Sequence, residues 1–63
     1  MLDYEKVASQ YGMDWIDLYD AIHYILASKK GSYIEAQSYQ NSISEKFSQS
    51  DWIIAEKIVS EEF

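Results

Sequence analysis

The stretch VASQYGMDWIDLYDAI, residues 7–22, decides the fold, because it predicts two amphipathic helices on either side of one glycine. Asp3 stands where a capping residue is expected at the start of the first helix, and Gly12 stands where a left-handed residue commonly ends one. The apolar residues between them follow the i, i+3, i+4, i+7 pattern of one helix face: Tyr4, Val7, Ala8 and Tyr11.

A second helix is expected to begin directly after this turn. Asp14 is a suitable N-cap, and Met13 can pack on Leu18 as a hydrophobic staple. Lys29 and Lys30 complement the negative end of the helix dipole before a glycine ends the helix. We expect this helix to lie across the middle of the fold, because its apolar face is broad. That face comprises Trp15, Ile16, Leu18, Tyr19, Ile22, Ile25 and Leu26.

Capping patterns predict two further helices. Ser32 and Glu35 have the spacing of a capping box, and Ser48 and Asp51 have it again. Poor helix formers surround Asn41 and are compatible with a break or distortion at that point, although an ordinary solvated helix face is the favoured interpretation. The inner row of the third helix is expected to be Ala36, Tyr39, Ile43 and Phe47, and that of the fourth Trp52, Ile54, Ala55, Ile58 and Val59.

The composition fits one small helical domain. A chain of 63 residues with 48% hydrophobic and 16% aromatic residues is too apolar for a disordered acidic tail, yet too short to bury a large core. Proline and cysteine are both absent, so no disulfide or cysteine-ligated zinc stabilises the chain. We therefore expect residues 1–63 to form a single all-α domain, a compact bundle of three to four short helices. Its predicted core contains Val7, Leu18, Ile22, Ile43, Trp52 and Ile58.

The charge and the distribution of apolar residues indicate in which cellular compartment the chain acts and which classes of partner it can bind. Five basic against eleven acidic residues leave a net charge of −6, which repels nucleic acid and anionic lipid. All five basic residues are lysines, so the arginine fork that most often reads guanine is missing. The sequence has no long uninterrupted apolar block and no basic leader. We expect a soluble cytoplasmic protein that binds neither membrane nor, directly, nucleic acid.

Residues 7–22 also have the spacing of a helix-turn-helix. A small residue lets the two helices approach, a glycine permits the turn, and an apolar pair packs behind it. Any compact helical hairpin has these requirements, so the pattern predicts a helix-turn-helix-like pair near the N-terminus more strongly than it predicts DNA binding. The residues that carry the resemblance are Ala8, Gly12, Met13 and Leu18.

Catalytic and metal-binding patterns are missing from the sequence. His23 is the only histidine, and no cysteine is available to complete a common zinc site. Neither a phosphate-cradling glycine loop nor a nucleophile elbow is present. We expect His23 to form a local hydrogen bond or to lie beside the core. We expect that the chain is not an enzyme and that it binds no cofactor or metal.

The candidate protein-binding residues combine negative charge with aromatic area. Asp14, Asp17 and Asp20 lie on the helix that would read DNA, where carboxylates repel phosphates. These residues either cap the helix and face solvent, or form an acidic recognition patch. Tyr24 and Tyr33 fall outside the main apolar rows, and exposed tyrosine is common at protein interfaces. We predict a small acidic protein-binding module, an adaptor or inhibitor, which docks through these five residues on a protein with a basic patch, such as a nucleic-acid-binding site.

Two other functions stay open on the sequence. A helix-turn-helix transcriptional regulator would need its lysines gathered on one face, which their order in the sequence does not favour. A structural oligomerisation domain would use the surplus aromatic residues to close a homodimer.

Overall fold

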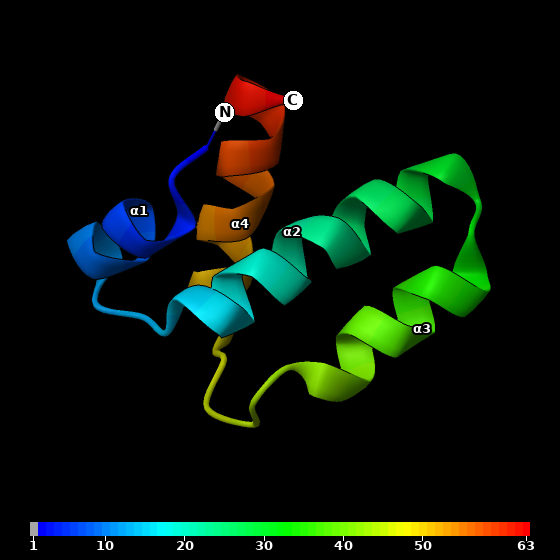
Figure 1. Cartoon of the computed structure of the whole chain (residues 1–63), viewed down its shortest axis with the longest axis horizontal. Coiled ribbons are helices and arrows are strands. Elements are labelled where there is room, and N and C mark those ends of the chain that lie inside the picture. The colour runs from blue at the N-terminus through cyan, green and yellow to red at the C-terminus, as the bar shows by residue number, and fades with distance from the viewer. Residues whose placement is uncertain (1) are drawn as a thin grey trace.

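Four helices make up the described part of the chain, residues 2–63, in the computed structural model (Figure 1). They are α1 (Tyr4–Tyr11), α2 (Trp15–Lys30), α3 (Tyr33–Ser42) and α4 (Gln49–Glu62). Residues 2–63 contain no strand. The prediction of an all-α bundle of short helices, with a helix-turn-helix-like pair near the N-terminus, is confirmed.

The caps predicted for the first two helices are present. The Oδ1 atom of Asp3 accepts a hydrogen bond from the backbone N–H of Lys6 at 3.1 Å, and that of Asp14 accepts one from Ile16 at 2.9 Å. Gly12 ends α1 with a φ of 70°, a left-handed conformation that a side chain would strain. The short turn between α1 and α2 is therefore determined by residues adjacent in sequence.

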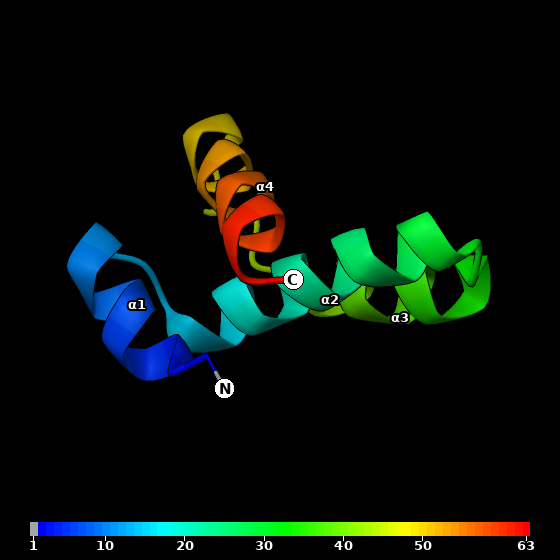
Figure 2. The same ribbon diagram turned by 90° about the horizontal axis from the view of Figure 1, so that it is seen from above.

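Helix α2 is the centre of the fold, because α1, α3 and α4 each pack against it. Helices α2 and α3 lie side by side as a hairpin, whereas α4 crosses α2 on one face of that layer (Figure 2). The prediction that the second helix lies across the middle is confirmed.

The core forms where α1, α2 and α4 meet. Three alanines at this junction are almost completely buried and let the helices approach closely. Of the six predicted core residues, Leu18, Ile22 and Ile58 are buried, whereas Val7, Ile43 and Trp52 are only partly buried at its border. The buried cluster comprises Ala8, Leu18, Ala21, Ile22, Ala55, Ile58 and Val59.

Of the two capping boxes predicted in the second half of the chain, the structure contains one. Ser32 precedes α3 but forms no side-chain capping hydrogen bond, so the first predicted capping box is wrong. Ser48 and Asp51 form the second box completely, with hydrogen bonds of 3.2 and 2.9 Å. Helix α3 ends at Ser42, so the break near Asn41 forms and the favoured interpretation of a continuous solvated face is wrong. The inner row predicted for the third helix therefore extends too far, since its last two residues lie beyond the helix.

Candidate protein-interaction surface

The three aspartates of the predicted acidic face have different surroundings. Asp14 is exposed and caps α2. Asp17 is half-buried, and its Oδ1 atom accepts a hydrogen bond of 3.1 Å from the backbone N–H of Ser44, which fixes the loop before α4 to α2. Asp20 is only 8% exposed. The prediction that Asp20 lies on an outer face is wrong, because the helices packed around α2 leave little of it uncovered.

Burial determines how Asp20 titrates. Desolvation raises the pKa of its carboxyl, the negative charge of Asp17 raises it further, and His23 acts in the opposite direction. The charged form of Asp20 is therefore unfavourable inside the fold, and this carboxylate is not available to a partner at the surface.

The two tyrosines predicted as exposed contacts also differ. Tyr24 is half-buried, and its ring packs edge-on against Trp52 with centroids 5.4 Å apart, so its predicted exposure is wrong. Tyr33 is 74% exposed, as expected, although its role in binding stays a prediction. Tyr33 begins α3, beyond the C-terminal end of α2, whereas Asp14 precedes the N-terminal end. The five predicted binding residues therefore do not form one surface.

Asp14 and Asp17 do share a cleft of about 480 Å³ with Asp51, between the first turn of α2 and the loop that precedes α4. Each carboxylate in this cleft accepts a backbone N–H, from Ile16, Ser44 and Ser48 respectively. These hydrogen bonds give all three aspartates a structural role. Among residues 2–63, no group of three or more His, Cys, Asp or Glu side chains is arranged to hold a metal ion.

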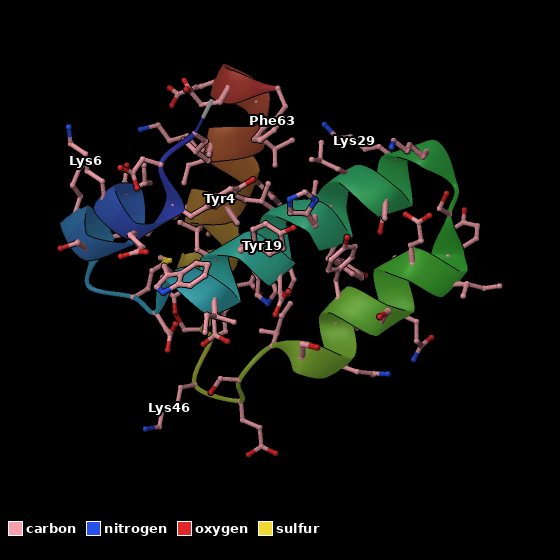
Figure 3. All side chains as sticks on the ribbon, in the orientation of Figure 1. Tyr4, Lys6, Tyr19, Lys29, Lys46 and Phe63 are labelled. Carbon is pink, nitrogen blue, oxygen red and sulfur yellow. The ribbon has the colours of Figure 1, made fainter. Side chains whose placement is uncertain are left out.

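An aromatic cluster connects α1, α2 and α3. The ring of His23 lies 4.2 Å from that of Tyr19 and 5.4 Å from that of Tyr39, and the Tyr4 ring lies 5.0 Å from that of Tyr19. The Tyr4 and Tyr19 side chains meet on the same side of the molecule (Figure 3). His23 was expected beside the core or in a local hydrogen bond, and it is half-buried in this cluster.

The polar groups of this cluster respond to their burial. The hydroxyl of Tyr4 lies 3.3 Å from Nε2 of His23. Burial is the main cause that lowers the pKa of His23; Asp20 counteracts it and Lys30 adds to it. Burial, and then the proximity of Tyr19, raises the pKa of Tyr4. Both side chains are therefore kept neutral, which suits a structural link between helices.

The first turn of α2 exposes two large apolar side chains, Trp15 at 43% and Ile16 at 51%. Trp15 belongs to the apolar face that was expected to lie across the middle of the fold, and its exposure shows that this expectation is wrong for Trp15. Trp15 is the first residue of α2, at the end of the helix, where it lines two surface hollows. The position directly after the N-cap was the feature of the sequence that could have indicated this exposure.

Carboxylates border both hollows beside Trp15. One, of about 390 Å³, is lined by Leu2, Asp3, Tyr4, Glu5 and Trp15. The other, of about 470 Å³, is lined by Glu5, Ala8, Ser9, Met13, Asp14, Trp15 and Ile16. Neither set of lining residues includes a lysine. We call this surface the acidic aromatic end, and it consists of Asp3, Glu5, Asp14, Trp15 and Ile16.

The lysines are spread over the molecule. Lys6 extends from α1 away from Tyr4, Lys29 lies near the far end of α2, and Lys46 extends from the loop before α4 (Figure 3). A continuous basic surface for a DNA backbone would require such residues to lie together.

The comparisons with known proteins identify no relative. No protein-family model matches the chain, and no curated protein or solved structure is significantly similar to it. Within residues 2–63, no helix has both the length and the apolar character needed to cross a membrane.

Proposed function

We propose that this chain is a small acidic protein-binding module, an adaptor or inhibitor, whose partner docks a basic patch on the acidic aromatic end. The observation that carries this proposal is the exposure of Trp15, which lines two surface hollows together with Asp3, Glu5 and Asp14.

Trp15 has the properties of an interface anchor. Tryptophan is among the residues that contribute most to binding energy, especially where a ring and its neighbouring hollows can be desolvated together. A large apolar ring exposed on so small a domain also carries a solvation penalty that a partner would remove. The two hollows that Trp15 lines give a partner's side chains room to pack beside it.

The charge around Trp15 favours a cationic partner. A lysine or arginine side chain can lie over an indole face while a nearby carboxylate neutralises its charge. The net charge of −6 adds a long-range attraction to a basic surface, which increases the association rate more than the final affinity. A nucleic-acid-binding site is one such basic surface, because carboxylates can occupy the positions of phosphates. Since the chain has no cysteine, it has no disulfide that the reducing cytoplasm would break, and we propose that it acts there.

The proposal is tested by capturing partners from lysate on three immobilised proteins: the wild type, Trp15→Ala and Ile53→Ala. Ile53 is the matched control, because it is a large apolar residue on α4 that is 58% exposed. A specific partner should be retained by the wild type and Ile53→Ala and lost from Trp15→Ala. Quantitative mass spectrometry measures the retention, and circular dichroism confirms that each variant is folded. Equal capture by all three proteins would contradict the proposal.

A further inference from the structure

A second exposed apolar patch lies at the opposite end of α2. Ile34 is 90% exposed and adjoins the exposed Tyr33, at the start of α3. Lys29 and Lys30 are exposed in the last turn of α2, and Glu35 is the only carboxylate in the segment 29–35. We call this segment the hairpin tip.

The hairpin tip and the acidic aromatic end are complementary. The tip combines two exposed apolar residues with a net positive charge, whereas the acidic aromatic end combines Trp15 and Ile16 with three carboxylates. The 16 residues of α2 separate them by about 24 Å, at 1.5 Å per helical residue. Figure 1 places the first turn of α2 and the turn between α2 and α3 on opposite sides of the molecule. One copy therefore cannot cover its own acidic aromatic end with its own tip.

We propose that the hairpin tip of one copy docks on the acidic aromatic end of a second copy. Ile34 would enter the hollow beside Trp15 that is lined in part by Ala8 and Met13. Lys29 and Lys30 would then face the carboxylates of that end. Burial of apolar area supplies the attraction, and the opposite charges fix the direction of the contact.

This contact is heterologous, because it joins two different surfaces. A pair joined by such a contact keeps one free tip and one free acidic aromatic end, so association continues into a ring or an open chain rather than stopping at a dimer. The contact patches are small and each copy carries a charge of −6, so the association is weak and depends on protein concentration. The association between copies uses the same acidic aromatic end as the proposed function but requires no other protein.

The test uses two variants that each disable one surface, Ile34→Asp at the tip and Trp15→Ala at the acidic aromatic end. Sedimentation velocity over a concentration series should show the wild-type average mass rising above the monomer mass of 7.4 kDa and passing that of a dimer. Each variant alone should remain monomeric, because its contact has only one intact surface. An equal mixture of the two should form dimers and nothing larger, because one tip and one acidic aromatic end remain.

Ile53→Asp is the matched control, since it places the same charge on an exposed isoleucine of α4, and it should associate as the wild type does. A wild type that stays monomeric throughout, a single variant that still associates, or a mixture that stays monomeric would each overturn the proposal. Partner capture by Ile34→Asp tests the proposed function separately from the association between copies, because that variant keeps the acidic aromatic end. Its capture of a partner is expected to be unchanged whether or not copies of the chain associate.

Discussion

The hydroxyl of Tyr4 and Nε2 of His23 lie 3.3 Å apart and join α1 to α2 across 19 residues of sequence. The tautomer of the imidazole determines which group donates, because Nε2 accepts the hydroxyl hydrogen when it is unprotonated and donates to the hydroxyl oxygen when it carries a hydrogen. Burial lowers the pKa of His23, which favours the neutral ring within the aromatic cluster.

Acidification should weaken the fold through His23. Because its folded pKa lies below the unfolded value of about 6.5, its contribution to stability is complete above that pH and is lost as pH falls through the folded pKa. Urea unfolding at pH 7.5 and pH 5 should therefore show a smaller loss of stability in His23→Gln than in the wild type. An identical loss in both proteins would show that another group causes it.

Tyr4→Phe tests the hydrogen bond without removing the ring. Losing one such bond should cost about 0.5–1.5 kcal/mol in the free energy of unfolding near pH 7.5. Tyr11→Phe is the matched control, because Tyr11 is an exposed tyrosine of the same helix, and its stability should be unchanged. Equal unfolding midpoints for the two variants would contradict a structural role for the Tyr4 hydroxyl.

Asp20→Asn should stabilise the protein at pH 7. The folded pKa of Asp20 is raised, so its contribution to stability is complete below the unfolded pKa and is lost as pH rises through the folded pKa. The substitution removes the buried charge and should raise the thermal midpoint at pH 7 but not at pH 3. Glu56→Gln controls for the change in net charge, because Glu56 is exposed on α4. A lower midpoint for Asp20→Asn at pH 7 would mean that the carboxylate is favourable where it lies.

Ile22→Ala should unfold the protein or nearly so. Ile22 is completely buried, and removing such a side chain costs about 2–5 kcal/mol, a large part of the stability of so small a domain. Ile53→Ala should change stability by less than about 0.5 kcal/mol, because Ile53 is exposed. Far-ultraviolet circular dichroism during thermal unfolding measures both, and an unchanged midpoint for Ile22→Ala would contradict the core assignment.

The ends of the helices could be predicted from sequence because caps act locally. Asp3, Gly12 and Asp14 interact with backbone groups only a few residues away, so their spacing is sufficient to place the ends of α1 and the start of α2. The same reasoning failed at Ser32, where the capping spacing is present but the side-chain hydrogen bond is not. A local pattern permits a cap without requiring it.

The exposure of residues along α2 could not be predicted in the same way. Three helices pack on α2, so Asp20 is buried although it is charged, and Trp15 is exposed although it is aromatic. Periodicity identifies one apolar face, whereas the arrangement of the other helices determines which side chains are covered. Of the five candidate residues, only Asp14 and Tyr33 are therefore exposed, whereas Asp17, Asp20 and Tyr24 are partly or largely covered.

The central claim is that a basic partner docks on the acidic aromatic end, and the association rate constant tests it most directly. The association rate constant of a captured partner is measured across a salt series with the wild type, Glu5→Gln and Glu56→Gln. Glu5→Gln removes one exposed charge at the acidic aromatic end, and Glu56→Gln removes one exposed charge away from it. We predict slower association and a weaker salt dependence for Glu5→Gln alone, because nearby charges steer the encounter. Association rates for Glu5→Gln that equal those of Glu56→Gln at every salt concentration would contradict the claim.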